Sequence, residues 1–139
     1  MIDSFREEYR FLSNFYPANF VWQGFFWPTV EHAYQAAKTL ALEERIQILG
    51  LSTPGQAKSM GRRITMRDDW DHIKVNIMRE IVTEKFNQNS HLMYLLEETK
   101  PHNLIEGNTW GDIFWGQCNG QGENHLGRIL MEIRDGNAS

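Results

Sequence analysis

A carboxylate and an amine share one stripe of a segment with helical periodicity, directly after an aromatic run. Glu31, Tyr34, Gln35 and Lys38 are spaced by three, four and seven residues, so on a helix they lie on one face. Alanines and Leu40 form the opposite, apolar face. A carboxylate beside an amine is typical of carbonyl and glycosyl chemistry. The alternative is that Glu31 and Lys38 lie on a solvated helix face and do no chemistry.

A second group of candidates lies in a long glycine-rich stretch, residues 107–122, which contains Asp112 and Trp115. Connections of this length are more often functional than incidental. Residues 120–124 lead into the expected start of the last helix, where unpaired N–H groups and the positive end of the helix dipole suit a phosphate. This glycine pattern is weak by itself, because tight turns need glycine in any case.

Tryptophans offer stacking surfaces. Trp70, Trp110 and Trp115 lie beside charged or glycine-rich sequence, whereas Trp22 and Trp27 are expected in the core. Rings on the wall of a cleft stack on bases and sugars. The alternative for each ring is ordinary packing.

The histidines and the single cysteine form no pattern that predicts a metal or a nucleophile. The five histidines are scattered, and Glu31-His32 lacks the second histidine of a metal-binding helix. No histidine and acid can be assigned to Cys118, which is expected to be a packed or surface thiol. We expect no metal and no cofactor.

Composition limits the possible partners and location. The chain has 139 residues, the size of one domain, and a formal charge of −4. That charge argues against extended nucleic-acid binding, although a single nucleotide or a short end remains possible. Without a leader or an apolar run near the roughly 18 residues of a membrane span, we expect a cytoplasmic protein with no membrane partner.

The elements that must position these residues are mostly helices. The pattern predicts a mainly α fold, a single compact helical domain over residues 1–139 with a short N-terminal β element. Short strands are expected within residues 5–26, turning at Gln23-Gly24, and at residues 103–106. Helices are expected over residues 28–42 with Pro28 in the first turn, 43–49, 54–61, 69–89 as the core helix, 90 to just before 101, and 123–134.

Short motifs follow one another along almost the whole chain: 11–15 (FLSNF), 27–38 (WPTVEHAYQAAK), 61–62 (GR), Trp70 with Lys74 and Met78, 85–89 (KFNQN), 112–116 (DIFWG) and 122–131 (GENHLGRILM). In order and spacing these motifs resemble the YbiA-like, or NADAR (NAD and ADP-ribose associated), family. The chain departs from the family's glycine-rich pattern at residues 117–119, which bears on the substrate that fits.

The resemblance implies a mainly helical fold and a hydrolase, an N-glycosidase acting on ribosyl N-glycosidic bonds. The expected substrates are phosphoribosylamino-pyrimidine intermediates of riboflavin biosynthesis, and the acidic charge mildly favours such a small phosphorylated metabolite. One alternative is removal of ADP-ribose from guanine bases. Alternatives of other classes are a non-catalytic ADP-ribose or NAD-binding module and a scaffold whose aromatic loop meets a partner.

The resemblance also assigns site residues. Glu31, Trp70 and Asp112 would be functional, with Lys38 and Trp115 close by. The resulting expectation is catalysis by Glu31, Asp112 and Lys38, with Trp70, Trp115, Asn14, Tyr34, Gly122 and Asn124 binding substrate. In one mechanism Glu31 activates water or steadies a cationic sugar; in the other, Lys38 forms a Schiff base with C1 of the ring-opened sugar.

Overall fold

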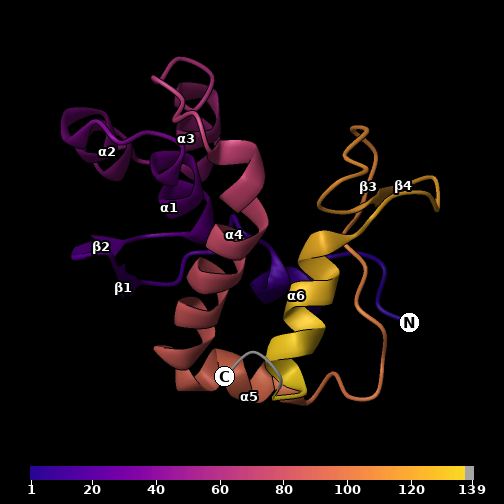
Figure 1. The fold of residues 1–139 in the computed structure, drawn as a ribbon. Helices are drawn as coiled ribbons and strands as arrows, with labels where there is room; N and C mark the ends of the chain where they lie inside the picture. Colours follow the sequence, from indigo (N-terminus) through magenta and orange to yellow (C-terminus); the bar gives the residue numbers. More distant parts are fainter. Residues whose placement is uncertain (137–139) are drawn as a thin grey trace. The chain divides into compact units, whose positions relative to one another are not determined.

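Helices dominate the computed structural model, which describes residues 1–136 (Figure 1). The helices are η1 (a 3-10 helix, Glu7–Leu12), α1 (Val30–Ala37), α2 (Leu42–Leu49), α3 (Pro54–Met60), α4 (Trp70–Asn87), α5 (Ser90–Glu97) and α6 (His125–Arg134). The strands are β1 (Phe20–Trp22), β2 (Phe25–Trp27), β3 (Gly107–Asn108) and β4 (Gln117–Cys118). The prediction of a mainly α fold is confirmed.

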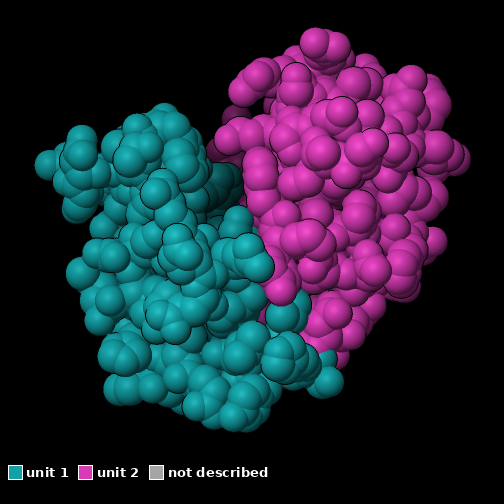
Figure 2. Space-filling model, turned by 180° about the vertical axis from the view of Figure 1, so that it is seen from behind, with its two compact units in different colours: residues 1–13, 90–139 teal, residues 14–89 magenta. Residues whose placement is uncertain are grey.

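The chain divides into two compact units, which Figure 2 colours separately. Unit 2 is the continuous stretch 14–89, and unit 1 combines residues 1–13 with the chain from Ser90 onward. Each unit is described by itself below, and the expectation of a single domain stays a prediction.

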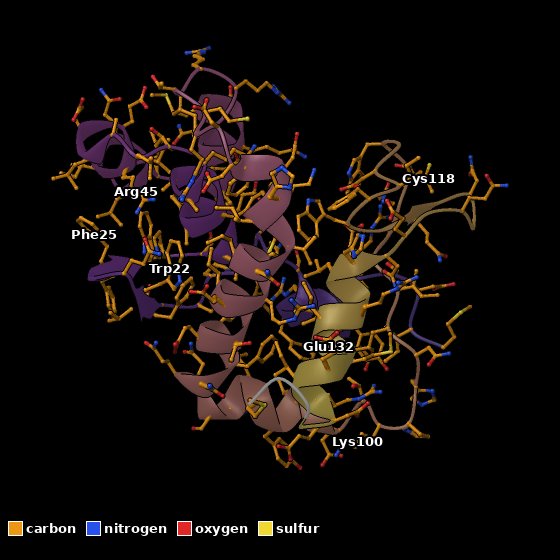
Figure 3. All side chains as sticks on the ribbon, in the orientation of Figure 1. Trp22, Phe25, Arg45, Lys100, Cys118 and Glu132 are labelled. Carbon is orange, nitrogen blue, oxygen red and sulfur yellow. The ribbon has the colours of Figure 1, made fainter. Side chains whose placement is uncertain are left out.

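Unit 2 begins with the expected hairpin. β1 and β2 pair antiparallel, and the turn residues Gln23 and Gly24 both adopt left-handed backbone angles, with φ of 50° and 82°. Two such residues make the turn that matches the right-handed twist of the strands. Arg45 of α2 donates a hydrogen bond to Gln23 Oε1 at 2.8 Å, and Figure 3 labels it near the hairpin. Trp22 and Trp27 are buried as predicted, and the indole N–H of Trp27 donates to the Trp22 carbonyl at 2.9 Å.

Helix α1 is shorter than its sequence pattern at both ends. Thr29 is the N-cap, and its hydroxyl accepts the His32 N–H at 3.1 Å, so Pro28 lies outside the helix and its predicted place in the first turn is wrong. The helix ends at Lys38, the C-cap. Leu40 is therefore beyond the helix and exposed, not part of an apolar face as predicted.

Of the remaining helices of unit 2, only α3 begins at a side-chain cap. Thr53 and Gln56 form a capping box at the start of α3, with Pro54 in the first turn as predicted. α4 is the core helix, and it buries Ile81 and Phe86 completely. Asp69 is its N-cap residue, but the carboxylate pairs with Arg67 at 2.7 Å and does not cap the helix. α1 contacts α2, α3 and α4.

Unit 1 joins the start of the chain to its later part. Ile2 N–H donates to the Asn103 carbonyl at 2.9 Å, and Ile105 N–H donates to the Ile2 carbonyl at 2.8 Å. The strand predicted at residues 103–106 is reduced to a single bridge between Ile2 and Leu104. Residues 7–12 form the 3-10 helix η1, so the prediction of short strands within residues 5–26 is wrong for that part.

The long glycine-rich stretch of unit 1 contains a minimal sheet, the parallel pair of β3 and β4. It leads into α6, which packs against α5 and buries Leu126, Ile129 and Leu130. Within residues 1–136 no helix has the length and apolar character needed to span a membrane.

Candidate active site

Glu31 lies in the first turn of α1 and is buried, with 7% of its surface exposed. Its Oε2 accepts a hydrogen bond of 2.6 Å from Gln35 Nε2, one turn further along. Its backbone N–H donates to the Asn14 carbonyl at 3.1 Å, which fixes the start of the helix. The alternative that Glu31 lies on a solvated face is therefore wrong.

Gln35 links this carboxylate to the end of α3. The side chain of Gln35 is buried, and its Oε1 has no hydrogen-bond partner within residues 1–136. A Cβ atom on Gly61 would collide with Gln35 Oε1. Glycine at position 61 therefore allows the end of α3 to pack directly on the side chain that holds Glu31.

Lys38 is a half-buried amine at the other end of the same helix, with Nζ 5.6 Å from the centre of the Tyr34 ring. Burial lowers the pKa of Lys38, the negative charge of Glu31 opposes that shift, and the cations Lys74, Arg62 and Lys58 lower the pKa further. More of the neutral, nucleophilic amine is therefore present near neutral pH than for an ordinary lysine.

Two aromatic rings complete the group of candidates in unit 2. The centres of Tyr34 and Trp70 are 5.2 Å apart, with the planes inclined at 56°, and both side chains are buried. Asn14 Nδ2 donates to Met78 Sδ at 3.7 Å. Tyr34, Trp70 and Asn14 thus have packing roles within unit 2, and their expected contacts with substrate stay predictions.

Asp112 holds a turn in unit 1. Its Oδ1 accepts the backbone N–H groups of Phe114 at 3.1 Å and Trp115 at 2.9 Å. The side chain of Asn108 bonds both backbone groups of Asp112. Its Oδ1 accepts the Asp112 N–H at 3.0 Å, and its Nδ2 donates to the Asp112 carbonyl at 2.8 Å. Oδ2 of Asp112 makes no hydrogen bond in the described part of the chain, so this oxygen can meet a substrate while Oδ1 keeps the turn.

Trp115 belongs to an aromatic cluster that includes a histidine absent from the sequence-based list. The Phe114 and Trp115 rings meet edge to face at 4.9 Å, and the His125 ring lies 4.5 Å from Phe114 and 6.2 Å from Trp115. His125 Nε2 lies 3.3 Å from Glu123 Oε1. His125 lies within the motif at residues 122–131, and this motif could have indicated it as a candidate site residue from the sequence.

The first N–H groups at the start of α6 are bonded within unit 1, and the expectation of a backbone phosphate site there stays a prediction. The N–H groups of residues 123–126 all donate to carbonyls of the preceding loop: Glu123 to Ile113 (2.7 Å), Asn124 to Gly116 (3.2 Å), His125 to Phe114 (3.1 Å) and Leu126 to Trp115 (3.0 Å). These four donors are therefore not available to an anion.

Gly122 and Asn124 shape this loop, and their expected contacts with substrate stay predictions. The buried Asn124 amide accepts the Glu106 N–H at 3.0 Å and donates to the Leu104 carbonyl at 3.0 Å. Gly122 has a φ of 144°, and a Cβ there would collide with the Gly116 carbonyl. Both positions are therefore fixed by contacts inside unit 1.

Among residues 1–136, no group of three or more histidine, cysteine, aspartate or glutamate side chains is arranged to hold a metal ion. Cys118, labelled in Figure 3, lies half-buried in β4, where its N–H donates to the Gln121 carbonyl at 2.9 Å. The candidates thus form two sets, one around Glu31 and Lys38 in unit 2 and one around Asp112 in unit 1. Their convergence into one site stays a prediction.

Comparison with known proteins identifies the family. Residues 3–136 match the family model described as NADAR domain, so the chain belongs to the NADAR domain family, as its motifs indicate. N-glycosidase YbiA of Shigella flexneri serotype 5b (strain 8401) is 39% identical over 132 residues, which cover 93% of this chain and 82% of that protein.

Two further similarities extend this result. Riboflavin biosynthesis protein VVA0006 of Vibrio vulnificus (strain YJ016) is 40% identical over 132 residues, 93% of this chain but 36% of that protein. The NMR structure of the Escherichia coli protein YbiA matches with a TM-score of 0.88 and 36% identity, covering 99% of this chain and 85% of that chain. The mainly helical fold is thus shared with YbiA.

Proposed function

We propose that this protein is an N-glycosidase that hydrolyses the ribosyl N-glycosidic bond of phosphoribosylamino-pyrimidine intermediates of riboflavin biosynthesis. Relatives named as N-glycosidases and as a riboflavin biosynthesis protein support the reaction class and the substrate. The observation that carries the proposal is the buried Glu31 carboxylate, held at 2.6 Å by Gln35 on the same helix as the half-buried amine of Lys38.

Cleavage of a ribosyl N-glycosidic bond requires a fixed carboxylate near C1, and Glu31 can supply it. Breaking a ribosyl C–N bond builds positive charge on C1 and the ring oxygen, and a fixed carboxylate stabilises that charge or activates water. Glu31 takes this role in the proposal because a buried, oriented carboxylate loses little free energy to reorganisation during the reaction. Asp112 assists through Oδ2, by holding ribose hydroxyls or moving the proton to the departing nitrogen.

A covalent version of the mechanism uses Lys38. The neutral amine adds to C1 of the ring-opened aminosugar, the C1–N bond to the pyrimidine amine breaks, and that amine leaves with a proton delivered by Glu31. The resulting Lys38 imine is hydrolysed by water, which returns the free lysine and releases the sugar as its aldehyde. Support for this route is the lowered pKa of Lys38, caused first by burial.

Two other functions compete with the proposal. Removal of ADP-ribose from guanine bases would use the same bond chemistry on a larger substrate. A non-catalytic reader of ADP-ribose or NAD would need fewer ionisable groups than Glu31, Lys38 and Asp112 provide, which favours an enzyme.

An assay of the purified protein on two substrates separates these functions. We expect free aminopyrimidine from an aminouracil ribotide, with much slower release of guanine from ADP-ribosylated guanosine. Faster release from the second substrate would establish the alternative activity. Binding of ribose 5-phosphate or ADP-ribose without release from either substrate would establish the reader.

A further inference from the structure

Unit 1 contains a cavity of about 560 Å³ that none of the candidate catalytic or substrate-binding residues lines. Its walls come from residues 1–6, from residues 105–109, and from residues 117–120 in β4 and the turn after it. This volume lies within the usual range of small-molecule sites. We propose that the cavity binds a phosphorylated sugar, with Arg6 holding the phosphate and Asp3 accepting hydrogen bonds from the sugar hydroxyls. This site is additional to the proposed function and does not depend on it.

The first wall is fixed by the backbone of Ile2. Ile2 forms a bridge with Leu104, and its side chain is buried. Successive side chains of an extended segment point to opposite faces, which agrees with the place of Asp3 in the cavity wall. A Cβ atom on Gly107 would collide with the Asp3 carbonyl, so glycine at position 107 allows β3 to lie directly against this segment.

A tight turn forms another wall. Asn119 and Gly120 both adopt left-handed backbone angles, with φ of 55° and 76°. The residues on either side, Cys118 and Gln121, exchange two backbone hydrogen bonds of 2.9 and 3.1 Å. These bonds and the strand pairing fix the walls before a ligand arrives, which lowers the cost of ordering them on binding.

Two charged side chains in the cavity wall are free to meet a ligand. Arg6 and Asp3 are exposed, and neither side chain makes a hydrogen bond or an ion pair with any residue of the described chain. They line one cavity without pairing with each other. A ligand that carries both an anionic group and hydrogen-bond donors can therefore use both.

A phosphorylated sugar has these two kinds of group. A guanidinium forms paired hydrogen bonds with phosphate oxygens, and a carboxylate accepts hydrogen bonds from neighbouring hydroxyls. The hydroxyls of Ser4 and Thr109 also line the cavity and add neutral partners for the sugar.

The side chain of Asn108 completes the wall but is already engaged. It is buried, and both ends of its amide bond the backbone of Asp112, at 3.0 and 2.8 Å. Recognition is therefore left to Arg6, Asp3 and the hydroxyls. The competing interpretation is that Arg6 and Asp3 are ordinary solvated charges around a hollow that holds water.

NMR titration of the isotope-labelled full chain with ribose 5-phosphate tests the proposal. In the wild type we expect the backbone amide signals of residues 107–109 and 117–120 to shift. Arg6→Gln should weaken this binding about ten- to hundredfold, as for loss of charge-assisted hydrogen bonds. The Arg6 side chain does not cap η1, so this variant should keep the fold. Arg10→Gln, at an exposed arginine of η1 outside the cavity wall, is the matched control and should bind like the wild type.

Two further titrations separate the roles of the charged groups. Asp3→Asn should weaken ribose 5-phosphate binding about tenfold and leave the binding of inorganic phosphate unchanged. Ribose should bind the wild type at least about tenfold more weakly than ribose 5-phosphate. Equal binding of the two sugars at residues 107–109 and 117–120 would overturn the role of Arg6. A nucleoside monophosphate that binds more tightly than ribose 5-phosphate would show that the sugar recognised carries a base.

The positions of the shifted signals separate failure of this proposal from failure of the proposed function. No shift at residues 107–109 and 117–120, or equal affinity in wild type and Arg6→Gln, overturns the cavity as a sugar phosphate site, whether or not hydrolysis is observed. Shifts there that depend on Arg6, in a protein that hydrolyses no substrate, keep the site and overturn the hydrolase.

Discussion

Gln35 donates its side-chain amide to the Glu31 carboxylate across one turn of α1, while its own carbonyl oxygen lies buried against Gly61 without a hydrogen-bond partner in residues 1–136. The direction of the candidate catalytic carboxylate therefore depends on a glycine at the end of α3. Because Gly61 has no side chain, Gln35 fits against it and can hold the carboxylate of Glu31.

Gly61→Ala should disturb this relationship through packing alone. The backbone at Gly61 has a φ of −59°, which alanine adopts readily, so the expected cost comes from the collision with Gln35 Oε1. We expect a loss of about 1 to 3 kcal/mol in the free energy of unfolding, with a lower kcat as Gln35 moves away from Glu31. Urea unfolding gives the first value and steady-state kinetics the second.

A double-mutant cycle isolates the contact. In a Gln35→Ala background, Gly61→Ala should cost little because the colliding side chain has been removed. An equal cost of Gly61→Ala in both backgrounds would show that the collision with Gln35 is not its origin.

Glu31→Gln should lower kcat by about two or more orders of magnitude while the melting temperature changes little, because the amide keeps the size of the carboxylate but not its charge. Glu43→Gln, on the exposed face of α2, is the control and should retain wild-type kinetics. Full activity in Glu31→Gln would remove the residue from the mechanism.

Borohydride trapping during turnover tests Lys38. If the imine forms, reduction leaves a sugar adduct on the Lys38 peptide, found by mass spectrometry, and the yield rises with pH because the neutral amine is the nucleophile. Because burial and the neighbouring cations lower the pKa of Lys38, that rise should begin below the range of an ordinary lysine. Absence of an adduct in an active enzyme would leave only the water-activating mechanism.

Asp112→Asn and Asp112→Ala separate the two oxygens of this carboxylate. Asparagine keeps an Oδ1 that can accept the N–H groups of Phe114 and Trp115, so the loop should persist while kcat falls. Alanine loses both bonds and should also reduce the free energy of unfolding by about 1 to 2 kcal/mol. An asparagine variant with full activity would assign Asp112 a purely structural role.

Lys85 makes stability depend on pH. Burial lowers the pKa of this lysine from 10.5 to about 7, and its Nζ lies 5.1 Å from the centre of the Phe86 ring. From about pH 7 to 10 the unfolded chain holds a proton that the folded chain has lost, so raising the pH stabilises the fold. Below that window both states are charged and this contribution stays constant at its minimum.

Lys85→Met should reduce the slope of the free energy of unfolding against pH by up to about 1.4 kcal/mol per pH unit, the limit for a single proton. Denaturant midpoints at several pH values measure the slope, which does not depend on the overall stability of the variant. Lys100→Met, at an exposed lysine labelled in Figure 3, should keep the wild-type slope. The same slope in Lys85→Met as in the wild type would contradict the prediction.

The features that sequence reasoning predicted are those with local causes. The start of a helix at Pro54 and the hairpin turn at Gln23 and Gly24 depend on residues within a few positions of one another. The spacing of Glu31 and Lys38 likewise placed both on one helix.

The missed features depend on contacts distant in sequence or on competing local bonds. The Thr29 cap outweighed the helical pattern that extended to Pro28, and loop carbonyls at residues 113–116 accept the N–H groups of residues 123–126. Burial of Glu31 and Lys85 required the neighbouring elements, because acidic and basic side chains are ordinarily exposed. The cytoplasmic location stays a prediction.

The discontinuity of unit 1 sets an order in which the chain can form. Unit 2 is one uninterrupted stretch, so its contacts need no residue beyond 89 to leave the ribosome. Ile2, in contrast, must wait for Asn103 and Ile105 to leave the ribosome before it gains its backbone partners. The surroundings of Glu31 and Lys38 can therefore form before Asp112 has left the ribosome, and under the proposed function the nascent chain stays inactive until then.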